Sequence, residues 1–476
     1  MTASSSLLDT LRQAVGAAHV LTEGDLAAYE QDWRRRERGR ALAVVRPAST
    51  AEVAAVVRAC AAQGAAIVPQ GGNTGLSVGS VPDGSGTQVV LSLRRMDAVR
   101  AIDGANLTLT VEAGCILQNL QAAAEGAGHL FPLSLAAEGS CTIGGNLGTN
   151  AGGTAVVRYG NTRELCLGLE VVTPRGEIWD GLTGLRKDNT GYDLKHLFIG
   201  AEGTLGIVTR AALKLFPRPA ESAAAWVALS SAENAVAFAS MARTALDTAL
   251  SAVELINAEQ VRLVLRHVAN TRRVFAEDYP YYVLLEASSM RADGSIAQNL
   301  QDILANAIEA GIIEDAVCAA TLAQAAEFWS VRHGVAEANR AEGMGITMDA
   351  AVPVGRVSAF LKEADARLAD DFPQAKPVVV SHLGDGNVHY IAMVPAAIWQ
   401  EIEEKLDYVH RVRAAINDIA VKQHSGTFSA EHGVGQTLVP EVGRYKSEVE
   451  LKLLRGIRHL LDPRGLFNPG KLLPSA

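Results

Sequence analysis

The sequence predicts a protein of two or three domains that mixes helices with strands, and three observations support this. The chain has 476 residues, too many for one compact core, because domains usually contain about 100 to 200 residues. Three glycine-rich loops lie among strand-like segments in the first half of the chain. After Pro217-Arg218-Pro219 glycine becomes rarer, and amphipathic helical patterns alternate with a few strands. We therefore expect a domain boundary near residue 218.

The first domain is expected to begin with a helix and then a strand. Ser49 and Glu52 form a capping-box pattern, and apolar residues follow at helical spacing up to Cys60. The strand AIVPQ and a glycine-rich turn come next, and further strands are expected at VVLSL and LTLTVEAG. In the common dinucleotide fold the glycine motif lies between a strand and the helix that follows it. The order found here predicts a different architecture.

The glycine-rich loops are GGNTGLSVGS, EGSCTIGGNLGTNAGG and GAEGTLGIVT. Glycine lets main-chain N–H groups approach phosphate oxygens without β-carbon clashes, and successive N–H groups form anion-binding concavities. One such loop alone is more often a simple turn. Three of them in one domain favour a backbone that wraps around a long ligand containing a pyrophosphate.

The second domain contains the expected strands YYVLLEAS, VVVSHL and VHYIAMV. Between Trp399 and Lys422, apolar residues recur at steps of three and four, which predicts one helix with a buried face. That helix leads the chain to Glu431 and His432 in the segment SAEHGVG.

Two histidines flank an Asp-Gly pair in SHLGDGNVHY. If Asp385 and Gly386 are the central residues of a two-residue turn, His382 and His389 lie directly opposite each other, with β-carbons about 4.5–5.5 Å apart. Two imidazoles at that separation can bind one divalent ion. Glu431 would complete a three-ligand site with one position open to substrate or water.

Each of these residues also has an ordinary structural explanation. An isolated sheet histidine is more often hydrogen-bonded than metal-bound. Glu431 and His432 could form a surface turn, because Gly433 and Gly435 suit a loop of any role. The hairpin spacing favours the metal site, with His432 as a proton-transfer base beside it.

Composition narrows the classes of function. The formal net charge of -9 and the pI near 5.7 give no electrostatic reason to expect nucleic acid or an anionic membrane. The five cysteines form no Cys-x-x-Cys pair, which argues against a zinc ribbon, an iron–sulfur site or a disulfide framework. The sequence has no secretory signal pattern and no run of 18 apolar residues. We expect a cytoplasmic protein that acts on small molecules.

Six segments in order resemble the FAD-linked D-2-hydroxy-acid dehydrogenases of the vanillyl-alcohol-oxidase superfamily, the group that includes D-2-hydroxyglutarate and D-lactate dehydrogenases and the glycolate oxidase flavin subunit. They are PQGGNTGLSVGSVP, EGSCTIGGNLGTNAGG, GAEGTLGIVT, SHLGDGNVHY, SAEHGVG and FNPGKLLP. The resemblance implies an α+β fold: an N-terminal segment (1–40), an FAD-binding domain of two subdomains (41–218), a cap domain with an antiparallel sheet flanked by helices (219–415), and a C-terminal segment returning to the flavin (416–476).

The resemblance also implies the residues that bind FAD. They lie in the three glycine-rich loops and near the C-terminus: Gly71, Gly72, Asn73, Thr74, Gly75, Leu76, Gly139, Cys141, Thr142, Gly145, Asn146, Asn150, Gly153, Gly206, Ile207 and Asn468. Covalent relatives attach FAD through His or Cys, whereas the first loop offers Asn73 and Thr74 there. We therefore expect noncovalent FAD, with Cys141 in a packing role.

In this family the residues matching His382, His389 and Glu431 hold a divalent metal, usually zinc, and the residue matching His432 is the base. A metal that chelates a 2-hydroxy acid lowers the pKa of its hydroxyl, so that His432 can take the proton while a hydride passes to flavin N5. Arg332 matches an arginine that pairs with a substrate carboxylate. Otherwise it would be a solvated helix arginine.

Three departures from the family pattern bear on the substrate. Ala336 and Thr347 stand where dicarboxylate-using relatives carry threonine and lysine, and Ile391 replaces an asparagine that contacts the substrate. Because an unpaired buried carboxylate is costly, a D-2-hydroxy acid with a short or moderately apolar tail is expected over D-2-hydroxyglutarate. Arg332, His333 or Arg340 could still receive a second carboxylate.

The remaining expectations concern partners. Without iron–sulfur cysteines, electrons must leave FAD for an external acceptor, such as electron-transfer flavoprotein or a quinone-linked carrier. A homodimer is a possible assembly. The alternatives are a flavin-dependent oxidase of another alcohol class and a catalytically silent flavin-binding protein.

Overall fold

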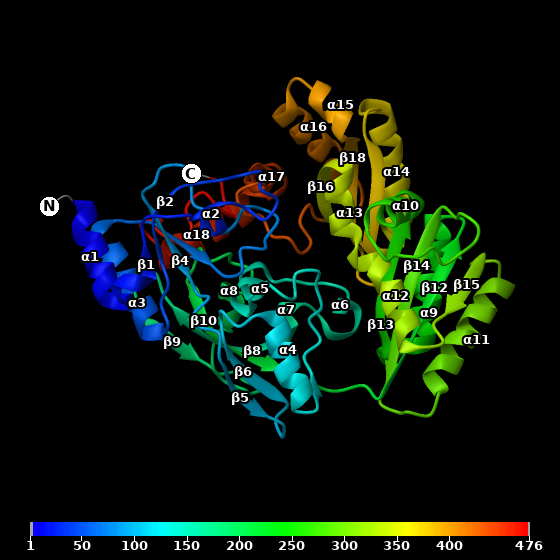
Figure 1. Ribbon diagram of the computed structural model, residues 1–476, viewed down its shortest axis with the longest axis horizontal. Helices are drawn as coiled ribbons and strands as arrows, with labels where there is room; N and C mark the ends of the chain where they lie inside the picture. Colours follow the sequence, from blue (N-terminus) through cyan, green and yellow to red (C-terminus); the bar gives the residue numbers. More distant parts are fainter. Residues whose placement is uncertain (1–2, 475–476) are drawn as a thin grey trace. The chain divides into compact units, whose positions relative to one another are not determined.

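The computed structural model in Figure 1 describes residues 3–474 and divides into two compact units. Of these residues, unit 1 comprises 3–152, 160–218 and 431–474, and unit 2 comprises 153–159 and 219–430. One division between the units falls after residue 218. They differ from the expected ranges at 153–159 and 416–430, which belong to unit 2.

Unit 1 contains a four-stranded sheet in the order β1-β2-β4-β3. Its strands are β1 (Val20–Leu21), β2 (Ala41–Val45), β3 (Ile67–Gln70) and β4 (Gln88–Ser92). β4 pairs in parallel with both β2 and β3, and α3 (Thr50–Gln63) connects β2 to β3. The side chain of Ser49 accepts the N–H of Glu52, and α3 ends at Gly64 with φ 67°, which confirms the expected helix start. α1 (Ala3–Val15) packs on α3.

A second sheet of unit 1 is antiparallel, in the order β5-β6-β10-β8-β9. Its strands are β5 (Val99–Asp103), β6 (Thr108–Glu112), β8 (Cys166–Val172), β9 (Ile178–Gly181) and β10 (Ile207–Lys214). A short ribbon joins β7 (His129–Leu130) to β11 (Phe216–Pro217). The two separate sheets correspond to the two subdomains that the resemblance implied.

Further helices complete unit 1. They are α2 (Ala27–Glu30), α4 (Leu117–Gly126), α5 (Ile143–Thr149), α7 (Thr162–Leu165), α8 (Lys195–Phe198), α17 (Val439–Tyr445) and α18 (Glu448–Leu461). After α18 the chain returns to the first sheet, where Phe467 forms a parallel bridge with Ile67 and the N–H of Asn468 donates to the carbonyl of Ile67 (2.8 Å).

Unit 2 is built on a seven-stranded antiparallel sheet in the order β15-β12-β14-β13-β17-β18-β16. Its strands are β12 (Glu221–Leu229), β13 (Leu250–Asn257), β14 (Tyr281–Ser289), β15 (Asp315–Cys318), β16 (Gly343–Ala351), β17 (Lys376–His382) and β18 (Asn387–Pro395). This confirms the antiparallel sheet expected for the second domain.

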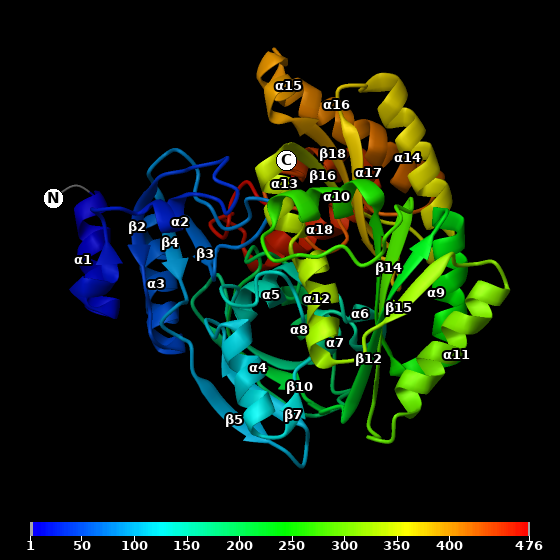
Figure 2. The same ribbon diagram turned by 45° about the vertical axis from the view of Figure 1, so that its right-hand side comes forward.

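Helices cover both faces of this sheet, as Figure 2 shows for α12 on one side and α9 and α11 on the other. One face packs against α9 (Ala232–Leu246), α11 (Ser295–Glu309), α14 (Val357–Asp371) and α16 (Lys405–Asp418). The other packs against α10 (Ala258–His267), α12 (Leu322–His333) and α13 (Val335–Glu342). Strand residues alternate between the two apolar cores, as Val227 and Trp226 do.

The helix expected between Trp399 and Lys422 is interrupted. It divides into α15 (Ala396–Glu401), α16 and a π-helical turn at Ile419–Gln423. Acidic side chains at Glu401, Glu403 and Glu404 oppose the negative end of α15 and suit the positive start of α16. This charge pattern favours a break between the two helices.

Residues 153–159 belong to unit 2 through α6 (Val156–Tyr159). The guanidinium of Arg158 donates to the carbonyls of Ala249 (3.4 Å) and Ser288 (3.3 Å). A β-carbon on Gly384 would lie 2.8 Å from Val157 Cγ2, so this segment packs closely against the loop between β17 and β18.

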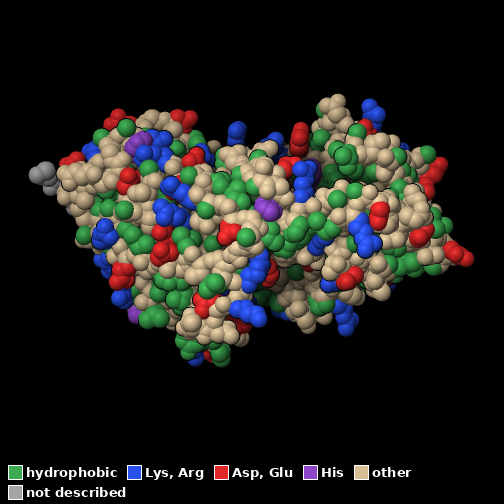
Figure 3. All heavy atoms as spheres, turned by 90° about the horizontal axis from the view of Figure 1, so that it is seen from below, with side chains coloured by type: hydrophobic (Ala, Val, Ile, Leu, Met, Phe, Trp, Pro, Cys, Tyr) green, Lys and Arg blue, Asp and Glu red, His purple; other side chains and the backbone are tan. Residues whose placement is uncertain are grey.

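The surface charges are mixed in sign. Figure 3 shows acidic and basic side chains interspersed over the face drawn, in keeping with the net charge of -9. Among the helices of residues 3–474, none is long and apolar enough to cross a membrane.

Candidate active site

A pocket in unit 1 is formed where the three glycine-rich loops converge, and His432 also lines it. Its walls include most of the residues expected to bind FAD: Gly71, Gly72, Asn73, Thr74, Gly75, Cys141, Thr142, Gly145, Asn146, Gly206 and Ile207. The expected residues outside its lining are Leu76, Gly139, Asn150, Gly153 and Asn468.

Glycine is required where the first two loops approach each other. A β-carbon on Gly71 would lie 2.2 Å from Thr142 Oγ1, and one on Gly72 would lie 2.1 Å from the carbonyl oxygen of Ser140. Asn73 continues the loop at φ 57°, where its amide oxygen accepts the hydroxyl of Ser80 (2.8 Å). These close approaches and this hydrogen bond define the loop conformation.

The pocket wall presents buried polar atoms without protein partners. Thr142 Oγ1 and Asn146 Oδ1 are buried and accept or donate no hydrogen bond within residues 3–474. Such atoms are costly unless a ligand or water satisfies them, so a polar cofactor fits this pocket. Burial raises the pKa of Cys141 to about 11. The thiol is therefore protonated near neutral pH, which fits its expected packing role.

Two of the expected FAD contacts have structural roles instead of a place in the lining. The buried amide of Asn468 donates to the carbonyls of Gly79 (2.8 Å) and Glu202 (2.7 Å). These two hydrogen bonds connect the first glycine-rich loop to the third. Asn150 ends α5 at φ 52° and accepts the N–H of Arg163 (2.9 Å).

The hairpin with the two histidines has a different register from the expected one. His382 pairs with Asn387, and His389 pairs with Val380. The expectation that the histidines lie directly opposite each other is therefore wrong, because four loop residues, 383–386, separate the strands instead of two. The histidines are diagonal neighbours on one face, and their ring centroids lie 5.3 Å apart.

The turn geometry explains the longer loop. The N–H groups of Asp385 and Gly386 both donate to the carbonyl of His382, at 3.2 and 3.1 Å. Gly386 has φ 85°, and a β-carbon there would lie 2.1 Å from the carbonyl oxygen of Val352. The turn is therefore packed against the segment around Val352 and closes before Asn387.

A carboxylate lies opposite each histidine on the neighbouring strand. Glu254 is the partner of His382, and its Oε1 lies 2.7 Å from His382 Nδ1. Asp349 is the partner of His389, and its Oδ1 lies 3.4 Å from His389 Nδ1. All four side chains are buried. The hydrogen bond from Nδ1 to Glu254 leaves Nε2 of His382 to bind a metal, the usual arrangement around metal-bound histidines, whereas Asp349 lies at ion-pair distance from His389.

Arg332 is not a solvated helix arginine. It lies in the last turn of α12, its side chain is 11% exposed, and its Nε donates to Glu254 Oε2 (2.6 Å). Burial alone would raise the pKa of Glu254, but the neighbouring His382 and Arg332 outweigh burial and lower it below the ordinary value.

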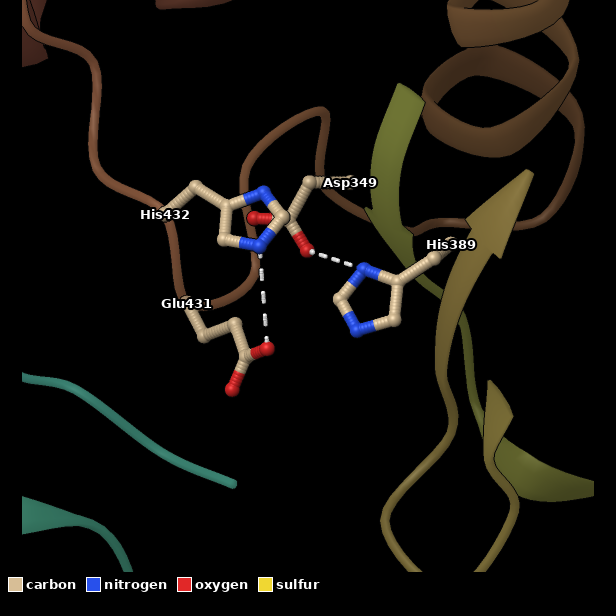
Figure 4. Close-up of side chains that lie close together, drawn as sticks. All are labelled: Asp349, His389, Glu431 and His432. Atoms are coloured by element: carbon tan, nitrogen blue, oxygen red, sulfur yellow. Dashed lines mark ion pairs between the residues drawn. The ribbon is translucent and has the colours of Figure 1, made fainter. Parts of the chain in front are cut away.

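Glu431 and His432 directly follow Ala430, the last residue of unit 2. The N–H of Ala430 donates to the main-chain carbonyl of Asp349 (2.9 Å) and to its Oδ2 (3.0 Å). Ligand atoms of Asp349, His389, Glu431 and His432 lie within 4.8 Å of one another, and Figure 4 shows the four side chains close together. Two imidazoles and two carboxylates form a donor set that suits zinc and similar divalent ions.

The expected ligands thus fall into two groups. His389 and Glu431 belong to this cluster, together with Asp349 and the expected base His432. His382 lies outside it, beside the ring of His389.

The segment after His432 is held within unit 1 by a buried carboxylate. Glu202 accepts the N–H groups of Val434 and Gly435, each at 2.7 Å. Burial raises the pKa of Glu202, although these two donors oppose the shift. Glu202 has φ 51°, a backbone conformation that non-glycine residues adopt mainly where the surrounding structure requires it.

Sequence reasoning missed Glu254, Asp349 and Glu202. The available signal was an isolated acid within an apolar strand, as in SAVELIN and TMDAAV, or within a glycine-rich loop, as in GAEGTLG. Acidic side chains are almost never fully buried unless they are paired. Each isolated acid therefore indicated a hydrogen-bonding or charged partner, but its identity could not be read from the sequence.

The residues that depart from the family pattern have different surroundings. Ile391 is buried in the apolar core under α10, α12 and α13, beside Val378 and Met393. Thr347, its cross-strand partner, is half-buried, and Ala336 on α13 is exposed. Ile391 therefore presents an apolar surface at the position where the asparagine of the family pattern would offer a hydrogen bond.

Comparisons with known proteins agree with this architecture. Residues 218–472 match the C-terminal domain of FAD linked oxidases, and residues 41–181 match an FAD binding domain. A D-2-hydroxyglutarate dehydrogenase of Xanthomonas citri pv. viticola is 40% identical over 467 residues, covering 97% of this chain and 96% of the relative. The mitochondrial D-2-hydroxyglutarate dehydrogenase of Rattus norvegicus is 37% identical over 475 residues, covering 96% of this chain and 86% of the relative.

Solved structures share the fold at lower identity. p-Cresol methylhydroxylase with substrate bound has a TM-score of 0.76 at 16% identity and covers 99% of this chain and 97% of its own. 4-Ethylphenol oxidase from Gulosibacter chungangensis has a TM-score of 0.76 at 19% identity, covering 99% and 98%. The chain therefore belongs to the FAD-linked oxidases and has their vanillyl-alcohol-oxidase type of fold. Within that family it falls among the FAD-linked D-2-hydroxy-acid dehydrogenases, as its six motifs implied.

Proposed function

We propose that this protein oxidises a D-2-hydroxy acid to the 2-oxo acid with noncovalent FAD and a divalent metal, most simply zinc. Relatives of nearly full length carry the name D-2-hydroxyglutarate dehydrogenase. The observation that carries the proposal is the pair of histidines, His382 and His389, each with a carboxylate at Nδ1. Two neighbouring histidines with purely structural roles would not each need a buried carboxylate opposite them on the next strand.

The glycine-rich loops of unit 1 would hold FAD through main-chain N–H groups and through the unpaired atoms of Thr142 and Asn146. FAD, when bound, supplies the acceptor for the substrate hydride at its N5. The protein binds and orients this cofactor, and neither Asn73 nor Thr74 offers a nucleophile for covalent attachment.

The metal would be held by His389 and Glu431 of the cluster together with the neighbouring His382, while Glu254 orients the imidazole of His382 and Asp349 lies beside that of His389. A bound divalent ion supplies a Lewis acid that lowers the pKa of the substrate hydroxyl. His432 then takes the hydroxyl proton. Arg332 pairs with the substrate carboxylate through its terminal amino groups, because its Nε–H is already donated to Glu254.

The substrate side chain is proposed to be short or moderately apolar. The relatives are named for D-2-hydroxyglutarate, whose second carboxylate needs its own partner in a desolvated pocket. Ile391 lies in an apolar core instead of offering such a partner. Ala336 has no polar side chain to take its place.

The test is anaerobic flavin reduction by D- and L-forms of lactate, 2-hydroxybutyrate, malate and 2-hydroxyglutarate, with and without a chelator. We expect bleaching by D-acids only, lost after metal removal, and fastest with a monocarboxylate. A clear preference for either dicarboxylate would refute the substrate proposal. Bleaching by phenols or other alcohols alone would favour another oxidase class, and no bleaching by any alcohol would favour a silent flavin-binding protein.

Electrons are proposed to pass to an external acceptor, such as electron-transfer flavoprotein or a quinone-linked carrier. All five cysteines are free thiols, which supports a reducing compartment such as the cytoplasm. Steady-state assays with each acceptor class and fractionation of the source cells would test these two points. A homodimer is a further expectation, which the mass in solution tests.

A further inference from the structure

Glu254 is a fully buried carboxylate whose two oxygens hold two different residues of the proposed site. We propose that Glu254 is a positioning residue that couples His382 to Arg332, so that metal binding and recognition of the substrate carboxylate depend on one side chain. The inference rests on the proposed function, in which His382 is a metal ligand and Arg332 binds substrate. All three residues belong to unit 2.

The residues around Glu254 exclude solvent from its carboxylate. Its side chain is 0% exposed, and it lies on the sheet face that packs against α10, α12 and α13, between apolar residues such as Ile256 and Val380. A buried carboxylate without partners would be strongly destabilising. The two hydrogen bonds to His382 and Arg332 are therefore structural requirements of this residue.

The bond to His382 sets the orientation of the imidazole. A carboxylate only accepts hydrogen bonds, so the contact of 2.7 Å between Glu254 Oε1 and His382 Nδ1 places the ring proton on Nδ1. The lone pair is then on Nε2, the nitrogen that would bind the metal. Carboxylates in this position typically raise metal affinity by about 10–100-fold.

The bond to Arg332 uses the other oxygen. Arg332 Nε lies 2.6 Å from Glu254 Oε2, so the planar guanidinium is fixed along one edge and its terminal amino groups remain for a bidentate contact. A 2-hydroxy acid carries its hydroxyl one carbon from its carboxylate. Because Arg332 and His382 are bound to the same carboxylate, the distance between the group that binds the substrate carboxylate and the metal that binds the hydroxyl would be fixed.

Asp349 does not share this double role. It contacts His389, and it also accepts hydrogen bonds from Asn387 and from the N–H of Ala430. Asp349 thus supports the hairpin and the segment that precedes Glu431. Glu254 alone of the two carboxylates reaches the arginine expected to bind substrate.

The test uses Glu254→Gln in the FAD-loaded protein. The amide keeps the size of the side chain, but its NH₂ group cannot accept the second hydrogen bond. We expect zinc affinity, measured by competition with a chromogenic chelator, to fall by about 10–100-fold. KM for the best D-2-hydroxy acid should rise at saturating zinc, while FAD content stays at the wild-type value. Wild-type zinc affinity and KM in this variant would overturn the inference.

Glu286→Gln is the matched control. Glu286 lies on the neighbouring strand β14 and accepts hydrogen bonds from Trp329 Nε1 (2.8 Å) and Ser251 Oγ (3.0 Å). Its substitution disturbs a carboxylate of the same sheet without touching His382 or Arg332, so zinc affinity and KM should not change. An equal loss in both variants would assign the effect to general damage of the sheet and overturn the inference.

The coupling itself is measured with Arg332→Gln and the double variant. If Glu254 acts on the substrate through Arg332, Glu254→Gln should raise KM much less when Arg332 is already replaced, whereas the loss of zinc affinity should remain. Independent, multiplying effects on KM would contradict the coupling. Should Glu254→Gln be insoluble, Glu254→Asp, which retains the charge with a shorter reach, is measured in the same way.

These readouts separate the inference from the proposed function. Failure of the wild-type protein to bind zinc, or to be bleached by any 2-hydroxy acid, contradicts the proposed function itself. Normal zinc binding and bleaching in the wild type, together with unchanged values in Glu254→Gln, contradict only the role of Glu254.

Discussion

The turn that carries both histidines can be tested through Gly386. Gly386 has φ 85°, and a β-carbon there would lie 2.1 Å from the carbonyl oxygen of Val352. The left-handed conformation costs a residue with a side chain about 1–2 kcal/mol, and forced contacts in a packed region typically cost about 1–3 kcal/mol. Gly386→Ala should therefore destabilise unit 2 by about 2–5 kcal/mol.

Two other glycines of unit 2 separate these contributions. Gly294 has a similar φ of 75° but open space around its α-carbon, and Gly355 has open space without a positive φ. Gly294→Ala should cost about 1–2 kcal/mol, and Gly355→Ala should cost little. For a unit of this size, each kcal/mol lowers Tm by about 2–4 °C. Thermal unfolding followed by calorimetry should therefore place Gly386→Ala about 4–20 °C below the wild type, with weaker zinc binding. If Gly386→Ala loses no more stability than Gly294→Ala, the close packing of the four-residue turn is refuted.

Three further predictions concern the cofactor, the metal and the base. The purified protein should be yellow and should release all its FAD on acid precipitation; flavin that stays with the polypeptide would contradict noncovalent binding. His382→Ala and Glu431→Ala should each lose the metal but keep FAD, as measured by elemental analysis and absorbance, and full activity of rigorously metal-free protein would refute the role of the metal. His432→Asn should retain metal and substrate binding yet slow flavin reduction by roughly 100-fold or more; a wild-type rate would show that another residue is the base.

Local signals in the sequence predicted the elements that depend on neighbouring residues. The capping residue Ser49 and the strand patterns around Val89 and Tyr282 are found where they were expected. The texture change near Arg218 coincides with the division between the compact units. These features are decided within a few residues of chain, by capping hydrogen bonds and by burial of one face.

Features that depend on distant parts of the chain were not accessible in this way. At the hairpin turn, the carbonyl of Val352 approaches Gly386 from outside the hairpin. Hydrophobic spacing alone cannot report such an approach.

Despite the error in the hairpin register, the two histidines are still neighbours, and the pleat of the sheet explains why. The observed pairing differs from the expected one by two residues, since His382 lies opposite Asn387 instead of His389. Side chains alternate between faces with a period of two, so a shift of two keeps both histidines on the same face and within contact. A shift of one would have turned one ring toward α9 and α14. The motif thus predicted the pair of histidines robustly, whereas the carboxylates opposite them come from strands 128 and 40 residues away in the chain and are identified only by the order of the strands.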